Sequence, residues 1–379
     1  MTGTSTTRSA RAEQWASTMA GVQVVGAPEG GREIRQAHVG DDCLRVSGSQ
    51  FGRTAREEAE DTELAAGATR AVGSGRRQIE EEPDEFRTCF ERDRDRILHS
   101  TAFRRLAGKT QVFIFPADHQ RTRLTHALEV AQVATAIARA CRLNVALVEA
   151  IALGHDCGHG PGGHASEDAM EVFVPGFDHA VWGADVTASG LNLCVETLDG
   201  IRNHSWSRPS PSTPEGQVVG LADRIAYCAH DLEDAVHAGV VAAGELPGVV
   251  VETCGVRRSE QLRAFITDVI TTVCGTGLVG LSAPLAEALA ELRRFNHERI
   301  YLRPESAAQA DAVIKMLRAL VDHYLANSAL LPEGLRESDD PITSAVAYVS
   351  GMTDRFACSQ AVSLLKWPHD RLPQGQYGA

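Results

Sequence analysis

The stretch RTRLTHALEVAQVATAIARACRLNVALVEAIALGHDCGHGPGGHASE, residues 121–167, decides the fold. From Leu124 to Arg142, apolar residues recur three and four positions apart, which is the spacing of an amphipathic helix. Val145–Leu153 has the pattern of a second apolar helix, and the glycines and proline of residues 154–163 end it. The residues expected on the buried face of the first helix are Leu124, Leu128, Ala131, Ala134 (or Val133), Ile137 and Cys141.

Helical periodicity also dominates outside this segment. One short stretch, Lys109–Phe115 (KTQVFIF), is β-like. We therefore predict an all-α helical bundle, with at most a small β-hairpin, rather than a βαβ sheet. Further helices are expected at residues 93–99, 102–106, 168–173, 191–204 (interrupted near Gly200), 215–239, 260–274, 284–300 and 306–325.

Composition excludes several classes of protein. The chain has 379 residues, 43% of them hydrophobic, which is enough for a sizeable core. No apolar run of about 18 residues occurs, so a membrane span is not expected. The first residues lack the apolar core of a signal peptide, and nine cysteines without a CxxC pair indicate a reducing cytoplasm. A net charge of -13 argues against a broad nucleic-acid surface.

Two histidines and two aspartates have the pattern of metal ligands. His126 lies in the first helix, the adjacent pair His155 and Asp156 follows the second, and Asp223 lies in LADRIAYCAHDLED. Each alone would more commonly be a structural group, but together they suit Mn, Fe, Ni, Co or Zn, and Mg less well. Such an ion would polarise a phosphate oxygen and lower the pKa of a bound water.

With ERDRDRILHSTAFRRLAGKTQVF, GLNLCVETLDGIRNH and FNHERIYLRPES, these motifs span roughly residues 91–306. Over this range the chain resembles the deoxynucleoside triphosphate triphosphohydrolases, the dGTPase-like branch of the HD phosphohydrolase superfamily. The resemblance implies the all-α HD bundle and cleavage of a dNTP to a deoxynucleoside and inorganic triphosphate, with water attacking the α-phosphorus. It also implies one divalent metal (Mn, Mg, Fe, Ni, Co or Zn) on the ligands His126, His155, Asp156 and Asp223.

His164 and Glu167, in GGHASE, match the catalytic histidine of that family and its supporting carboxylate. A glycine loop after His155 can return the His164 imidazole toward the ion, where it would act as general acid or base near neutral pH. Glu167, three residues later, could hold the other ring nitrogen. The alternative is a plain helix-start pair. His159 remains open between a phosphate-side donor, a group behind the ligands and a structural role.

Substrate contacts are expected on two helices. Arg123 precedes His126 by three residues and shares its face, and the resemblance makes Arg123 and Arg224 triphosphate contacts. Tyr227 and Asp231 lie four and eight residues after Asp223, on one helical face. The resemblance suggests that Tyr227 packs on the deoxyribose and excludes a 2′-hydroxyl, and that Asp231 accepts from the 3′-hydroxyl. Tyr227 could instead be a core aromatic.

The chain departs from the family pattern at two places. It has GHGPGGH where many relatives have GHPPFGH, so Gly160 and Gly162 could leave this loop less ordered before substrate binds. After GFDH, at residues 176–179, relatives usually have Asn and a Gln–Ser run, but this chain has Ala180, Val181 and Trp182. Since the ligands and His164 are present, we expect an active enzyme.

We expect three regions: residues 1–82 as a flexible N-terminal extension, 83–366 as the HD-type dNTPase domain and 367–379 as a frayed C-terminal tail. The resemblance also implies a homo-oligomer and leaves open an allosteric dNTP. Two alternatives for function remain: another HD phosphohydrolase acting on nucleoside monophosphates or signalling nucleotides, and a non-catalytic HD scaffold that senses nucleotides.

Overall fold

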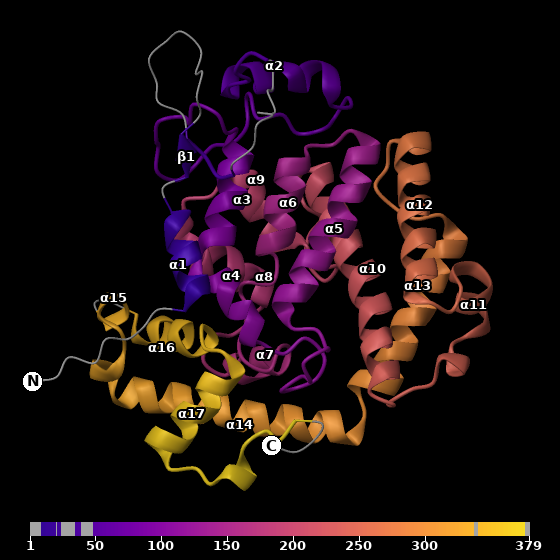
Figure 1. The fold of residues 1–379 in the computed structure, drawn as a ribbon. Coiled ribbons are helices and arrows are strands. Elements are labelled where there is room, and N and C mark those ends of the chain that lie inside the picture. The colour runs from indigo at the N-terminus through magenta and orange to yellow at the C-terminus, as the bar shows by residue number, and fades with distance from the viewer. Residues whose placement is uncertain (1–8, 20, 24–34, 39–47, 337–339, 376–379) are drawn as a thin grey trace, which may run out of the picture. The chain divides into compact units, whose positions relative to one another are not determined.

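The computed structural model describes residues 9–19, 21–23, 35–38, 48–336 and 340–375 (Figure 1). The chain divides into two units, Met1–Gln50 and Phe51–Ala379. Among the described residues of the smaller unit are helix α1 (Ala10–Ser17) and two antiparallel strands, β1 (Val22–Gln23) and β2 (Arg35–Gln36).

All regular elements in the described part of the larger unit are helices, joined by turns and loops. None of the described helices has the length and apolar character of a membrane span. The prediction of an all-α fold is therefore confirmed. Its α-helices are α2 (Arg53–Glu63), α3 (Cys89–His99), α4 (Thr101–Arg105), α5 (Arg123–Cys141), α6 (Val145–Gly154), α7 (Ala165–Met170), α8 (His179–Trp182), α9 (Val195–Asn203), α10 (Pro214–His237), α11 (Gly248–Cys254), α12 (Arg258–Thr276), α13 (Ala283–Asn296), α14 (Pro304–Ala326), α15 (Glu333–Arg336), α16 (Pro341–Ser350) and α17 (Asp354–Leu365). Short 3₁₀ or π turns are η1 (Leu106–Gly108), η2 (Gly183–Thr187), η3 (Ser189–Leu191), η4 (Ala243–Glu245), η5 (His297–Tyr301), η6 (Ser328–Leu330) and η7 (His369–Arg371).

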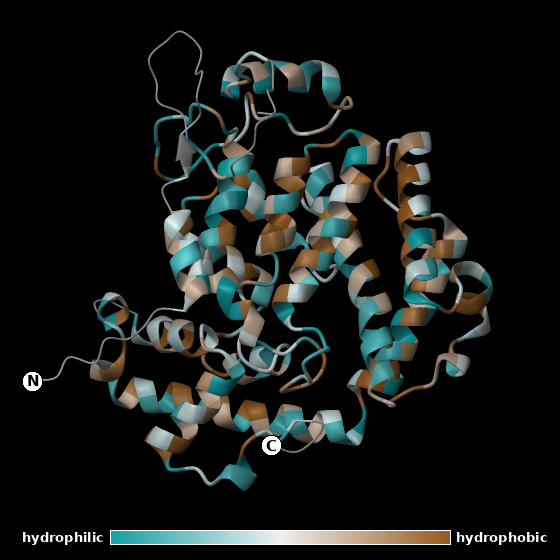
Figure 2. Cartoon of the chain, in the orientation of Figure 1, coloured by the Kyte–Doolittle hydropathy of each residue, from teal (hydrophilic) through white to brown (hydrophobic). Residues whose placement is uncertain are grey.

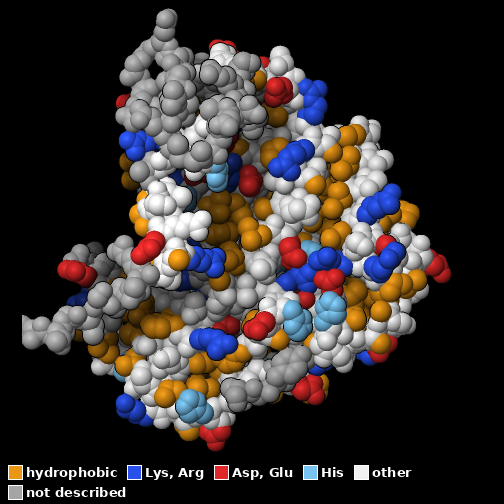
Figure 3. All heavy atoms as spheres, in the orientation of Figure 1, with side chains coloured by type: hydrophobic (Ala, Val, Ile, Leu, Met, Phe, Trp, Pro, Cys, Tyr) orange, Lys and Arg blue, Asp and Glu red, His pale blue; other side chains and the backbone are white. Residues whose placement is uncertain are grey.

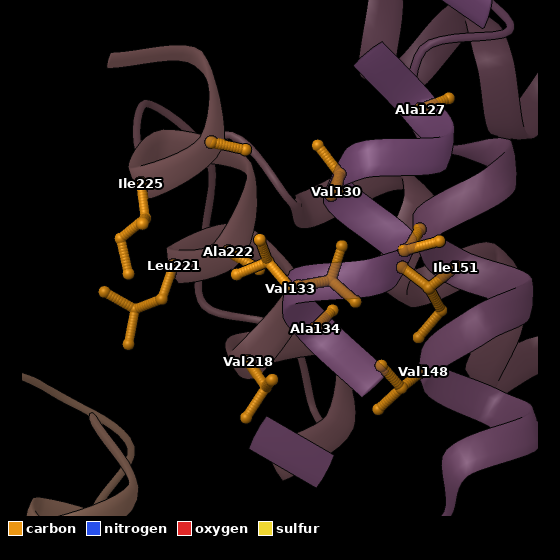
Figure 4. Close-up of a cluster of buried hydrophobic side chains, with 14 of the residues drawn as sticks. Ala127, Val130, Val133, Ala134, Val148, Ile151, Val218, Leu221, Ala222 and Ile225 are labelled. Atoms are coloured by element: carbon orange, nitrogen blue, oxygen red, sulfur yellow. The ribbon is translucent and has the colours of Figure 1, made fainter. Parts of the chain in front are cut away.

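Helices α5, α6 and α10 form the centre of the bundle. Their ends follow from local chemistry: Asn144 caps α6 by accepting from Leu147 N at 3.2 Å, and Arg142 ends α5 with a left-handed φ of 56°. Hydrophobic residues recur between hydrophilic ones along the helices, as amphipathic helices require (Figure 2). Figure 4 shows side chains from the three helices meeting in the core: Ala127, Val130, Val133, Ala134, Val148, Ile151, Val218, Leu221, Ala222 and Ile225.

The buried face of α5 differs in part from the sequence prediction. Leu128 is exposed and Leu124 is half-buried, whereas Ala127 and Val130 are fully buried. Most of the face is made of small residues, which allow α6 and α10 to approach α5 closely. The positions of Leu124 and Leu128 predict a buried face of α5 that is rotated away from the observed one.

Two other local predictions are corrected. Gly200 does not interrupt its helix: it lies inside α9, where a Cβ would stand 2.3 Å from Ile151 Cδ1, so the glycine lets α9 pack on α6. The stretch Lys109–Phe115 forms no strand and contributes one isolated bridge, between Thr110 and Thr122. Thr110 is tied instead to Asp354, whose carboxylate accepts from its N and Oγ1.

Residues 51–82 belong to the larger unit, so its boundary lies N-terminal to the expected position at residue 82. Arg77 forms an ion pair with the fully buried Asp93 at 2.6 Å. Thr69 donates from N and Oγ1 to the buried Glu215, at 3.0 and 2.7 Å. Part of the expected extension, including residues 24–34 and 39–47, lies outside the described residues.

Deleting residues 1–50 is expected to change the stability of the larger unit by less than about 1 kcal/mol. All buried apolar side chains of the described chain lie at Ala68 or beyond, so the deletion removes none of them. Deleting residues 1–77 is expected to destabilise by about 3–5 kcal/mol or more, because it leaves Asp93 buried without Arg77. Urea denaturation of both truncations measures the difference, and equal stabilities would contradict it.

A second cluster of buried residues joins α14, α16 and α17 with α7. Trp367 and Leu372 belong to this cluster and are 7% and 8% exposed, so the segment that we expected to fray is packed as far as it is described. Residues 376–379 of that expected tail lie outside the described residues. On the face that Figure 3 shows, basic and acidic side chains are interspersed among hydrophobic ones.

Candidate metal centre and its cavity

The four predicted metal ligands converge at one point. His126 projects from α5, His155 and Asp156 follow the end of α6, and Asp223 projects from α10. His126 Nε2 lies 3.1 Å from Asp223 Oδ1 and 3.8 Å from Asp156 Oδ2. His155 Nε2 lies 3.5 Å from Asp156 Oδ1 and 3.6 Å from Asp223 Oδ1. Ligands that surround one ion at about 2.0–2.2 Å stand about 3–4 Å apart, so these spacings fit a single divalent cation.

The orientation of His155 also fits a metal ligand. Its Nδ1 lies 2.7 Å from the carbonyl oxygen of Ala152, in position to donate a hydrogen bond. Its Nε2 is buried between the two carboxylates and makes no hydrogen bond to any residue that the structure describes. A histidine that donates from one ring nitrogen to a carbonyl presents the other nitrogen as a ligand. The residues present therefore fit a divalent metal, with His155 bound through Nε2.

The charges at the centre favour a cation. Burial would raise the pKa of Asp156, but Arg123, His155 and His159 outweigh it and hold the pKa well below its usual range. Burial would also raise the pKa of Asp223, but His126 and His155 outweigh it and hold that pKa well below its usual range. For His155, burial lowers the pKa, but Asp156 and Asp223 prevail and raise it to about 9. Two ionised carboxylates thus attract a proton to His155, and a dication would displace that proton.

Arg123 lies closer to the metal ligands than the sequence indicated. Its Nη1 donates to Asp156 Oδ2 at 2.7 Å, and the side chain is 3% exposed. The other oxygen of Asp156, Oδ1, faces His155 and lies 3.2 Å from His159 Nε2. Arg123 therefore orients the Asp156 carboxylate, and any contact with substrate phosphate adds to that role.

A cavity of about 920 Å³ opens beside the ligands. Its walls come from residues 110–114, the start of α5, the loop before α7, α10, η5 and the start of α14. All predicted site residues except His155 and Glu167 line this cavity, while His155 lies fully buried behind Asp156. The prediction thus identified side chains that the fold brings together.

His164 and Glu167 stand at the start of α7. His164 Nδ1 lies 3.1 Å from Glu167 Oε2, and the His164 side chain is 74% exposed. Glu167 also contacts His179, accepting from its backbone N at 3.1 Å and pairing with its Nδ1 at 2.5 Å. Burial would raise the pKa of Glu167, but hydrogen bonds from His164 and His179 lower it, so the carboxylate is ionised between two imidazoles.

Sequence reasoning missed His179 and His204. The His179 ring stacks on His159, with centroids 3.7 Å apart, and His179 Nε2 lies 3.3 Å from His204 Nε2. Burial, together with His155 and His179, lowers the pKa of His204 to about 4. Both residues end motifs of the chain, GFDH and GIRNH, but no spacing rule links them to the ligands. The only sequence signal was the density of histidines between residues 126 and 204.

The far end of the cavity carries a polar pair on α10 and the π turn η5. Tyr301 donates to Asp231 Oδ2 at 2.6 Å, and burial raises the pKa of Asp231 to about 6. Tyr227 is half-buried, and its hydroxyl accepts from Arg293 Nε at 3.0 Å. Tyr227 is thus a cavity residue with a polar partner rather than a plain core aromatic.

The two departures from the family pattern have structural reasons. Gly160 N donates to Ser166 Oγ and Gly162 N to Asp354 Oδ1, both at 2.9 Å, so the loop is anchored at both glycines. A Cβ at Gly162, where φ is 75°, would stand 2.6 Å from Val313 Cγ1. Ala180 and Trp182 are buried and do not line the cavity. These hydrogen bonds hold the loop in this structure, and the expectation that it is less ordered before substrate binds stays a prediction.

Comparison with known proteins defines the class. Residues 123–228, which contain all four ligands, match the HD domain family, and residues 279–362 match the phosphohydrolase-associated domain. Among solved structures, a hypothetical protein from Aquifex aeolicus aligns with a TM-score of 0.49 and 17% identity over 73% of this chain and 69% of that chain. The match to the HD domain family places the chain among the HD-domain phosphohydrolases.

Curated relatives narrow the class. A deoxyguanosinetriphosphate triphosphohydrolase-like protein of Caldanaerobacter subterraneus subsp. tengcongensis is 40% identical over 332 residues, 85% of this chain and 96% of the relative. One of Clostridium perfringens is 41% identical over 305 residues, 76% of this chain and 89% of the relative. The chain belongs to the family of deoxyguanosinetriphosphate triphosphohydrolase-like proteins.

Proposed function

We propose that the chain hydrolyses deoxynucleoside triphosphates to a deoxynucleoside and inorganic triphosphate, with one divalent metal. The observation that carries this proposal is the convergence of His126, His155, Asp156 and Asp223 at the wall of a cavity of about 920 Å³. That volume lies within the range of about 300–1,000 Å³ typical of small-molecule sites. The printed names of the relatives, triphosphohydrolase-like, support the choice of reaction.

In the proposed reaction a water oxygen bonds to the α-phosphorus, the bond from that phosphorus to O5′ breaks, and O5′ takes up a proton. A divalent metal held by His126, His155, Asp156 and Asp223 would polarise a phosphate oxygen and lower the pKa of the attacking water. His164 contacts Glu167 through Nδ1, which leaves Nε2 at the cavity to hold or move a proton. Arg123 keeps the Asp156 carboxylate in its ligand orientation.

The triphosphate and the deoxyribose of the substrate would bind other residues that line the same cavity. Arg224, next to Asp223, and Arg123 would provide positive charge for the triphosphate, and His159, which lines the cavity and pairs with Asp156, would stand beside it. Tyr227 would pack on the deoxyribose where a 2′-hydroxyl would meet its ring, and Asp231 would accept from the 3′-hydroxyl. The proposal includes a homo-oligomeric, cytoplasmic enzyme, for which light scattering and cell fractionation are the direct measurements.

The test is one assay of purified protein with the four dNTPs and, in turn, Mn, Co, Ni, Fe, Zn and Mg. We expect equal amounts of deoxynucleoside and inorganic triphosphate by ion-exchange chromatography. In ¹⁸O-labelled water, one labelled oxygen should appear in the triphosphate, because water attacks phosphorus. Orthophosphate or pyrophosphate as product would instead support a monophosphate or signalling-nucleotide phosphohydrolase. Tight dNTP binding without turnover with every metal would support a sensing scaffold.

A further inference from the structure

Trp206 is a large apolar side chain that stands half-exposed at the cavity wall. It lies in the loop after α9 and is 50% exposed. Its Nε1 donates to the carbonyl oxygen of Gly220, in α10, at 2.9 Å. The loop is pressed onto that helix, because a Cβ at Gly220 would stand 2.7 Å from His204 O. The indole is therefore held in place by a hydrogen bond and by backbone contact, although half of its surface is exposed and it lines the cavity.

Arg224 lies on this indole. Its guanidinium carbon stands 3.5 Å from the ring centroid, one helical turn after Gly220. Arg224 makes no hydrogen bond or ion pair with any residue in the described part of the chain, and its Nε is buried. The other three arginines that line the cavity are engaged: Arg123 with Asp156, Arg293 with Tyr227 and Arg303 with Ser306.

A stacked guanidinium presents its face to the ring and its N–H donors at its edge. The indole thus limits the rotamers of Arg224 while leaving its donors unpaired beside the metal ligand Asp223. Such a fixed, unpaired fork matches the oxygens of a phosphate group. Stacking also distinguishes Arg224 from a lysine at this position, because an ammonium group has no planar face.

We propose that Trp206 is a positioning residue that holds Arg224 as a preformed site for a polyphosphate oxygen. This inference rests on the proposed function only for the identity of the substrate, because the stacked pair and its unpaired donors are present in the chain itself. Trp206 acts through Arg224 and contributes no chemistry of its own.

The test uses the full chain with inorganic triphosphate as probe and calorimetry as readout. Trp206→Leu is expected to weaken triphosphate binding roughly two- to thirty-fold, the range of a cation–π contact. Trp206→Phe keeps an aromatic ring and should stay within about threefold of wild type. Arg224→Ala should weaken binding at least as much as Trp206→Leu. Adding Trp206→Leu to Arg224→Ala should cause no further loss, because the tryptophan would have nothing left to position.

Arg371→Leu is the matched control. Arg371 stacks on Trp367 at 3.6 Å but does not line the cavity, so its loss should leave triphosphate binding unchanged. With dNTP as substrate, Trp206→Leu should raise KM by the same factor and change kcat less than about threefold. Wild-type affinity in folded Trp206→Leu, additive losses in the double variant, or no triphosphate binding by the wild type would each overturn the inference. Triphosphate binding that depends on Trp206 in a chain without dNTP turnover would reject only the proposed function.

Discussion

Asp223→Ala is expected to abolish metal binding and hydrolysis together. Its Oδ1 lies 3.1 Å from His126 Nε2 and 3.6 Å from His155 Nε2, so its removal takes one ligand and half of the carboxylate charge from the centre. Outer partners of metal ligands are worth about 10–100-fold in affinity, so loss of a direct ligand should cost more than about 100-fold. Turnover should fall by more than about 10³-fold, because the metal supplies the main polarisation of the phosphate.

Asp223 is the better choice of carboxylate for this test. Asp156→Ala would also break the buried ion pair with Arg123, at a cost of about 3–5 kcal/mol in stability, and so would mix unfolding with metal loss. Asp93→Asn is the matched control, because Asp93 is a fully buried carboxylate that pairs with Arg77 and takes no part in the centre. The Asp93→Asn variant should be less stable than the wild type, but each folded molecule should still bind the metal. Full metal content in Asp223→Ala, by elemental analysis, would contradict the assignment.

His164→Ala should keep the metal and keep dNTP affinity within a few fold, while turnover falls by about 10²–10⁴. His164 contacts Glu167 and lies at the exposed edge of the cavity, so it should matter to proton transfer and little to ground-state binding. Stopped-flow or steady-state turnover together with metal analysis measures the split. Loss of metal in this variant would make His164 a ligand, and unchanged turnover would leave it as a helix-start residue. His159 would then be the better candidate for the proton-transfer role.

Glu167→Ala is expected to cost about as much as His164→Ala. From the sequence, Glu167 is expected to hold only the ring of His164, and a carboxylate that orients one ring would matter less than the ring itself. The structure shows that the same carboxylate also pairs with His179, so its removal frees two imidazoles. The double variant should be only slightly worse than either single variant, since residues acting as a unit are not additive. His237→Ala, an exposed histidine outside the cavity, should retain wild-type turnover.

The sequence predicted the parts of this molecule that depend on local pattern. The helices α5, α6 and α10 follow the apolar spacing, and His126, Asp156 and Asp223 follow from the order of ligands along them. Such patterns can be read from the sequence because a helix presents its side chains at fixed spacings along the chain.

Features that depend on long-range contact were not predictable in the same way. Trp206 lies in a loop whose sequence indicates only exposure, yet α10 fixes it. Leu128 looks like a core residue but is exposed, because the close approach of α6 and α10 selects the alanine face of α5. The unit boundary near Phe51 reflects Thr69 and Arg77, whose partners Glu215 and Asp93 are buried carboxylates farther along the chain, and no local pattern encodes those contacts.

The π turn η5, His297–Tyr301, has a consequence for how such sites diverge. A π turn is an α-helical turn with one extra residue, commonly retained at functional sites. Deleting one residue there would restore a regular α-helical turn and leave the helix on either side in nearly the same orientation, because the π turn absorbs its extra residue locally. The change would therefore be confined to the side chains that the turn presents, among them Tyr301, which donates to Asp231. A one-residue alignment gap that removes the tyrosine at this turn would mark a relative that lacks the polar pair at the cavity but keeps the surrounding helices.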